Sequence, residues 1–312
     1  ITFNDYSSVN DAILFYTGIV EGVEIMAGKI ELNLASPEYL KKNTLFSKFS
    51  TKLLSPLNSS DTNFLAEDLS MFPASTGTGL LEFYLKIDDE VMSYGSHSST
   101  TFNSVVRGLF GTTAASHDAD ASIEIIYRIN GSMKDIALSL MLSTPADQEQ
   151  FGNTFSNNRY SGGAYPNSIA FLGKEARKGL GLVLGDSITV TGSASNDGTY
   201  TITSLNYDDA TFTNYIGVGS SLVTEVGLAI ISFKSKYNTL GDYGLAMTPE
   251  QVDVPRHEEI TITDSVGFFD YDFLISDEIN GNDFINTQIY FPSGCYQIPR
   301  ETKASIGITK AP

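Results

Sequence analysis

The sequence predicts a mainly β protein with a minor α component, built from several small β-barrel or sandwich modules. Three observations predict this. First, the chain of 312 residues contains 16 Tyr, 19 Phe and 27 Gly but no Trp, and aromatic residues suit strands while glycines mark turns. Second, most apolar segments are short and alternate with polar residues. Third, only one segment shows a strong helical period. A chain of this length accommodates two or three modules.

The composition limits the function classes. Against 37 acidic residues stand 19 basic ones, so the formal net charge is −18; this disfavours a protein built mainly to grip nucleic-acid phosphates. With 41% hydrophobic and 18% charged residues, the chain is expected to be ordered. A lone cysteine, Cys295, excludes an intrachain disulfide framework and a Cys-rich zinc site. No apolar run is long enough for a transmembrane helix, and no signal peptide is recognised at Ile1.

Residues 1–57 read as strands followed by a polar connection. A strand is expected over 12–21, broken at Gly18, and 23–26 and 29–34 form a hairpin.

The turn of this hairpin is expected at Ala27-Gly28. In its second strand Ile30, Leu32 and Leu34 alternate with polar residues, which predicts one buried face and one solvent face. The connection that follows is the only locally basic segment, and we interpret it as solvated, with a partner contact as the alternative. Its lysines are Lys41, Lys42, Lys48 and Lys52.

Residues 58–78 have the composition of a linker, and residues 80–127 read as a compact β unit. Asp88-Asp89 makes the first turn of this unit. Its expected strands are 80–87, 90–94, 101–107 and 122–127.

Residues 131–144 form the clearest helix. Ser132 is an N-cap and Asp135, three residues later, completes a capping-box pattern. Pro145 ends the helix. One apolar face is expected from Met133, Ile136, Ala137, Leu140 and Met141.

Residues 148–184 have weak periodicity, and residues 185–233 are again β. Strands are expected at 187–191, 199–205 and 210–213. In the last part of the chain, 258–263 looks like a strand, 268–274 is either strand or helix, 283–289 is a short helix, and 295–299 pairs with 304–309.

The sequence shows no catalytic, cofactor-binding or metal-binding residues that we would assign. The histidines, His97, His117 and His257, are far apart and are interpreted as surface or turn residues. Neither a G-x-S-x-G elbow nor an H-E-x-x-H helix is present. Gly77-Thr-Gly79 is too short for a nucleotide loop. Cys295 is expected to be a small buried residue in an apolar hairpin.

The acidic clusters leave alternatives open. Asp88-Asp-Glu90 is interpreted as a solvated turn, with a cation site or a carboxylate pair as the alternative. Asp118-Ala-Asp120 and Tyr207-Asp-Asp209 resemble fragments of calcium loops but lack the full pattern. Asp270 and Asp272, together with Asp277 and Glu278, would suit a polysaccharide-cleaving carboxylate pair.

Four regions, taken in order, resemble tail hub proteins of tailed bacteriophages and gene transfer agents. Residues 14–25 and 28–37 resemble the hub β domain, which has an L-x-L-x-S-P strand. Residues 130–144, 237–253 and 285–299 resemble the hub helix and the two segments that follow it.

The second of these four regions resembles a small β module of phage tail-tip proteins. Its pattern I-D-D-E-x-x-x-Y, then R-G-x-x-G-T-x-A-x-x-H, matches residues 87–94 and 107–117. Residues 185–203 resemble a small hairpin module of virion proteins. The hub resemblance thus implies an N-terminally truncated hub β domain (1–57), an inserted module (58–128), the hub helix (129–147), a second inserted module (148–235) and a C-terminal hub α+β segment (236–312).

The resemblance implies a structural virion protein of the tail tip or baseplate, assembled in the host cytoplasm, with no enzymatic activity and no cofactor. Hubs form rings, commonly trimers, that join the tail tube to the tip. The implied partners are further copies of the chain, tail-tube, tail-tip and fibre proteins, and the tape measure protein. DNA would pass without specific binding, and no membrane insertion is expected. Two other functions stay open, a glycan-binding tail fibre or adhesin and a polysaccharide-degrading enzyme. The 16 Tyr residues and the loops rich in Asn, Ser and Gly favour the glycan-binding alternative, because aromatic rings can stack on sugars.

Overall fold

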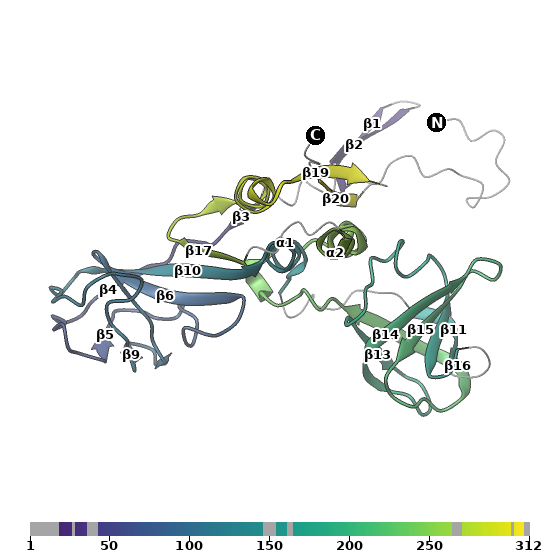
Figure 1. Cartoon of the computed structure of the whole chain (residues 1–312), viewed down its shortest axis with the longest axis horizontal. Coiled ribbons are helices and arrows are strands. Elements are labelled where there is room, and N and C mark those ends of the chain that lie inside the picture. The colour runs from purple at the N-terminus through teal and green to yellow at the C-terminus, as the bar shows by residue number, and fades with distance from the viewer. Residues whose placement is uncertain are drawn as a thin grey trace.

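A computed structural model describes residues 19–26, 29–35, 43–145, 154–160, 165–263, 270–300 and 303–308. In Figure 1 a long twisted sheet lies on one side, a barrel on the other, and two helices between them. The chain is mainly β with a minor helical part, as the composition predicts. Among the described residues no helix is long and apolar enough to cross a membrane.

Strand β10 (Ser122–Ser132) is the centre of the long sheet, whose strand order is β17-β10-β6-β7 with β4 pairing the far end of β10. Residues alternate along β6 so that Leu81, Leu85 and Ile87 are buried. Strand β10 also crosses the boundary expected at residues 128/129. It belongs to the first β module and leads directly into helix α1. The other strands are β4 (Ser50–Lys52), β6 (Leu81–Ile87), β7 (Glu90–Met92) and β17 (Asp270–Ile275).

A small three-stranded sheet, β5-β9-β8, covers this module. The third strand expected over 101–107 is limited to Thr101–Asn103, because Ser104 has a positive φ of 54° and Arg107 turns into a buried cluster described below. Residues 50–57 pack on the same module through β4 and the bridge between Leu57 and His117, so they lie on the module side of the boundary expected at 57/58. The strands are β5 (Phe64–Leu65), β8 (Ser96–His97) and β9 (Thr101–Asn103).

Helix α1 (Met133–Leu142) forms where the periodicity predicts it. The Ser132 side chain accepts a hydrogen bond from the Asp135 amide and caps the helix. Its apolar face is fully buried in the main core, together with Leu138 and Leu142. The helix ends three residues before Pro145.

Helix α2 (Val254–Thr263) corrects the sequence prediction, which placed a strand over 258–263. The alternating Ile and Thr residues favour a strand locally. In the folded chain Val254, His257 and Ile260 are all buried, at the three-residue spacing of one helix face. Tertiary packing against the main core therefore overrides the local preference.

The C-terminal part completes the main core. The segment expected as strand or helix at 268–274 contains strand β17, and its first two residues lie outside the described ones. The expected helix at 283–289 and the final hairpin are confirmed. They comprise α3 (Gly281–Asp283), η5 (Phe284–Tyr290), η6 (Phe291–Ser293), β19 (Cys295–Arg300) and β20 (Lys303–Ile308); β18 (Ile279–Asn280) pairs with β3 (Thr44–Leu45).

The second module is a closed sheet in the order β11-β12-β15-β14-β13-β16, with β16 returning to β11. It has its own core, which includes Ile169, Ile188, Ile216 and Phe233. Residues 210–213, expected as a strand, instead form the turn before β15 and its first residue, since Phe212 has a positive φ of 53°. The strands are β11 (Thr154–Tyr160), β12 (Ser168–Leu172), β13 (Ser187–Thr191), β14 (Gly198–Asp208), β15 (Thr213–Val218) and β16 (Glu225–Lys234).

The N-terminal hairpin pairs β1 (Ile19–Met26) with β2 (Lys29–Ala35), in the register expected. The turn at 27–28 and the expected strand before residue 19, with its break at Gly18, lie outside the described residues. The prediction of a buried face is wrong for the apolar residues described on it. Val23 pairs with Leu32 and Ile25 with Ile30, and the exposed fractions of these side chains run from 52% to 80%.

Candidate functional site

The three histidines lie in three separate places. His97 is half-buried and its ring contacts the carbonyl oxygens of Ser98 and Phe72. His257 is buried in α2, where its Nε2 lies 2.8 Å from the Tyr290 hydroxyl. The surface interpretation is therefore wrong for His257, and also for His117. Among the residues the structure describes, no group of three or more His, Cys, Asp or Glu side chains is arranged to hold a metal ion.

Two of the acidic residues near β17, Asp272 and Asp277, lie beside basic side chains. Asp272 accepts two hydrogen bonds from Arg128, at 2.8 and 2.9 Å, and Arg128 also contacts Glu82. The hydrogen bond from Arg128 lowers the pKa of Asp272, which is the opposite of what a general acid requires. Asp277 lies 3.6 Å from the Lys48 ammonium group instead.

In one of the fragments that resemble calcium loops, Asp208 uses its carboxylate locally. Asp208 accepts hydrogen bonds from the Ala210 amide and the Thr211 hydroxyl, which lowers its pKa. This is turn chemistry. Cys295, in contrast, is buried as expected, and burial raises the pKa of its thiol to about 11.

Glu90 lies at the centre of a cluster that we call the Glu90 clasp, in which the side chains of Glu90, Arg107 and His117 are buried and that of Asp88 is exposed at the edge. The guanidinium group of Arg107 binds the Glu90 carboxylate in a bidentate way, with both N···O distances 2.7 Å. The His117 ring lies between the two acids, with Nε2 2.9 Å from Glu90 and Nδ1 2.7 Å from Asp88. The expected solvated turn therefore holds for Asp88-Asp89 and is wrong for Glu90, whose side chain is 1% exposed.

Two backbone amides complete the clasp. The N–H groups of Gly108 and Ala115 each donate to Glu90 over 3.0 Å. Gly108 has a φ of 66°, and a Cβ there would meet the Ala114 nitrogen at 3.1 Å. The Glu of the I-D-D-E-x-x-x-Y pattern and the Arg-Gly and His positions of the R-G-x-x-G-T-x-A-x-x-H pattern thus meet in one structural feature.

The clasp stabilises the module and leaves no oxygen of Glu90 for a substrate. Burial alone raises the pKa of Glu90, but the hydrogen bonds from Arg107, the Ala115 amide and His117 outweigh burial and lower the pKa to about 2. A carboxylate that accepts this many bonds stays ionised and structural. Sequence reasoning missed the clasp because its partners are separated by 17 to 27 residues.

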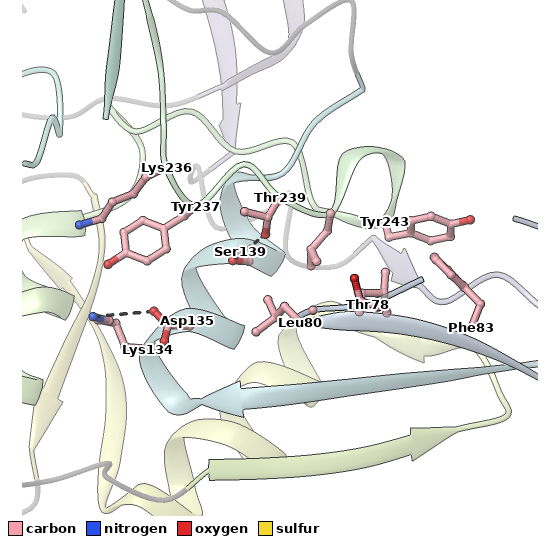
Figure 2. A pocket seen from close by; sticks show the side chains of 13 residues that line it. Thr78, Leu80, Phe83, Lys134, Asp135, Ser139, Lys236, Tyr237, Thr239 and Tyr243 are labelled. Carbon is pink, nitrogen blue, oxygen red and sulfur yellow. Dashed lines mark hydrogen bonds and ion pairs between the residues drawn. The ribbon is translucent and has the colours of Figure 1, made fainter. Parts of the chain in front are cut away.

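An open cleft of about 790 Å³ lies where three distant segments meet. These are the loop before β6, helix α1 and the segment that leaves the barrel after β16 (Figure 2). At one end lie Lys134, Asp135, Lys236 and Tyr237, and at the other Phe83 and Tyr243. Between them are two hydroxyl groups, those of Ser139 and Thr239, whose oxygen atoms are 3.2 Å apart.

No pattern in the sequence indicates this cleft. Lys134 and Asp135 stand on the polar side of the expected helix, and no local pattern ties them to Tyr237 or Tyr243, which lie about a hundred residues away. The Lys134 ammonium group is 6.0 Å and that of Lys236 is 5.1 Å from the centre of the Tyr237 ring.

Comparison with known proteins identifies no relative of the chain: no family, no curated protein and no solved structure matches it.

Proposed function

We propose that the chain is a structural subunit of a phage tail tip or baseplate, which forms a ring that joins the tail tube to the tip. One observation carries the proposal: the segment that resembles the hub helix packs against the two later segments of the resemblance. These segments are residues 130–144, 237–253 and 285–299. The Leu245 amide donates to the Leu140 carbonyl over 2.7 Å, and the Met247 amide to the Met141 carbonyl over 2.9 Å. Ile285 lies in the same core. Segments far apart in the sequence thus make one body, as an uninterrupted hub would require.

The two β modules differ in how they support the proposal: the first shares the core of this body, and the barrel has a core of its own. The first returns through β10, which leads directly into α1. The barrel begins after α1 and ends just before the segment that packs on α1. The barrel therefore behaves as an insertion that would contact neighbouring proteins or fibres from outside the ring.

The hairpin β1-β2 supports assembly with further copies of the chain. It pairs with no other strand of the described chain, and a lone two-stranded hairpin is marginally stable in water. Its exposed apolar pairs are Val23 with Leu32 and Ile25 with Ile30. Exposed apolar residues that lie together in this way are typical of a protein–protein interface. In the proposed ring, expected to be a trimer, this hairpin contacts the next subunit.

The remaining parts of the proposal follow from the ring. Tail-tube, tip, fibre and tape measure proteins are the expected neighbours. The net charge of −18 would repel DNA and let it pass without sticking. The protein performs no covalent chemistry in this role, and its place is the virion.

The experiment that tests the proposal measures the molar mass of the purified chain by light scattering over a concentration series, together with negative-stain images. A closed ring supports the proposal. A double variant, Ile25→Thr with Ile30→Thr, keeps β-branched side chains while removing apolar surface, and we expect it to shift the population to monomer without changing the circular dichroism spectrum of the folded chain.

The matched control is Ile230→Thr, which changes an exposed isoleucine on the barrel strand β16 that is 53% exposed. It should assemble as the unchanged protein does. A chain that stays monomeric at all concentrations, and also in the presence of tail-tube protein, contradicts the proposed ring.

A further inference from the structure

We propose that the cleft between the loop before β6, α1 and the segment 236–243 binds an oligosaccharide without charged groups. This inference goes beyond the assembly role and does not depend on it. The cleft shares no lining residue with the Glu90 clasp, and its volume of about 790 Å³ lies in the range of ordinary ligand sites.

The aromatic end of the cleft supplies a platform for the apolar face of a sugar ring. The rings of Tyr243 and Phe83 have centroids 5.1 Å apart at an angle of 49°, and both residues are half-buried. Both residues line the cleft at this end, and Tyr243 also lines a smaller pocket next to β3. Aromatic rings of this kind hold a ligand by contact area while leaving its polar edges free to bond elsewhere.

The polar end favours a neutral ligand over an anionic one. Lys134 has Asp135 at 3.7 Å, and Lys236 has Glu258 at 2.6 Å. Each ammonium group is thus matched by a carboxylate, so this end offers donors and acceptors but no excess positive charge. A phosphate or carboxylate would lack the unbalanced cation that usually recognises it, whereas sugar hydroxyls both donate and accept.

The middle of the cleft continues this pattern with the hydroxyl groups of Ser139 and Thr239. An extended peptide fits less well, because it normally pairs with an open strand edge. Beside the cleft β6 has no such edge: Leu81 pairs with Ile129 of β10, and the Phe83 amide donates to the Thr76 carbonyl.

The test is ligand-observed NMR and calorimetry on the full chain with a panel of neutral hexasaccharides built from glucose or N-acetylglucosamine. We expect binding of at least one of them at millimolar concentration or tighter. Changing Tyr243→Ala should weaken it by about tenfold, the size expected for losing one aromatic contact.

Two further variants make the test independent of folding defects. Lys134→Ala replaces a partly exposed side chain by a good helix former and should weaken binding severalfold. Tyr165→Ala removes a partly exposed tyrosine that stacks on Tyr215 of the barrel, with centroids 4.5 Å apart, and should leave binding unchanged.

Three outcomes overturn the proposal. In the first, no neutral saccharide of the panel binds. In the second, the Tyr243→Ala and Lys134→Ala variants bind as tightly as the unchanged protein, and in the third the chain prefers an acidic oligosaccharide or an extended peptide. Since the measurement does not depend on ring formation, its failure is distinguishable from failure of the assembly proposal.

Discussion

Glu90 shows how one residue organises a whole module. A buried carboxylate is costly unless it is paired and hydrogen-bonded, and here both oxygens are satisfied by Arg107, His117 and two backbone amides. Arg107 also donates to the carbonyl oxygen of Asn58. The clasp therefore ties the linker before the module to its turn and its long loop.

Replacing Arg107 with alanine is the sharpest test of the clasp. The change leaves the buried Glu90 carboxylate without its cation, so we expect a loss of about 3–5 kcal/mol in the free energy of unfolding. Urea titration followed by circular dichroism measures it.

The matched control is Arg177→Ala. Arg177 pairs with Glu259 at 3.0 Å, and both side chains are about half exposed, so a loss below about 1 kcal/mol is expected. Equal losses in the two variants would contradict the structural role assigned to the clasp.

The same carboxylate predicts a pH dependence. Because the pKa of Glu90 is lowered to about 2 in the folded chain, its contribution is fully present above its ordinary pKa and is lost as the pH falls towards 2. We expect the stability difference between the unchanged protein and Glu90→Gln to shrink over this range, as measured by urea titration at several pH values. A difference that grows on acidification would refute the assignment.

At the scale of elements, α1 and α2 illustrate two different causes of helix formation. The sequence signals for α1 are local: a capping serine, an acidic residue in the first turn and an apolar face. Those for α2 favour a strand. Its helix results from burial of Val254, His257 and Ile260 in the main core, an effect that no local pattern contains.

Changing Ser132→Ala tests the local cause. It removes the acceptor of the Asp135 amide hydrogen bond, so the free energy of unfolding should fall by about 1 kcal/mol. Chemical denaturation measures the change, and Ser59→Ala, in an exposed loop, is the control with an expected change near zero. An equal effect of both variants would show that the cap contributes nothing.

At the scale of the whole molecule, the described residues form two large cores with no shared member. One surrounds α1 and includes both β6 and the C-terminal hairpin; the other fills the barrel. Between them run polar contacts, such as the ion pairs of α2 with Lys236 and Arg177.

This division predicts that the barrel folds alone. A chain of residues 148–236 should give a cooperative thermal transition by circular dichroism, because its buried core is complete without the rest. Ile188→Ala in that fragment, which empties part of the core, should lower the free energy of unfolding by about 2–5 kcal/mol. A fragment that melts without cooperativity would show that the barrel depends on the main core.

The sequence predicts those parts of the fold that depend on local patterns of residues. The Asp88-Asp89 turn, the register of β1 with β2 and the hairpin β19-β20 follow from short patterns of a few residues. The strands β12 and β16 are not predicted, because their apolar residues do not follow one face: Ile230 of β16 is 53% exposed between the buried Ala229 and Ile231, and β12 is buried on both faces. Of the candidate site residues, the sequence correctly predicts that Cys295 is buried. The predictions for Glu90, His117 and His257 are wrong, because the structure buries all three.

The sequence by itself determined the mainly β class, helix α1 with its cap, and the turns, because these depend on neighbours along the chain. Only the tertiary structure decided that Glu90 is buried, that 254–263 is a helix, that Ile25 and Ile30 are exposed, and that Lys134 and Tyr243 line one cleft. Each of these depends on contact, or lack of contact, with segments that lie from about ten to about a hundred residues away. Their contacts exist only once the cores have formed, and local propensity carries no record of them.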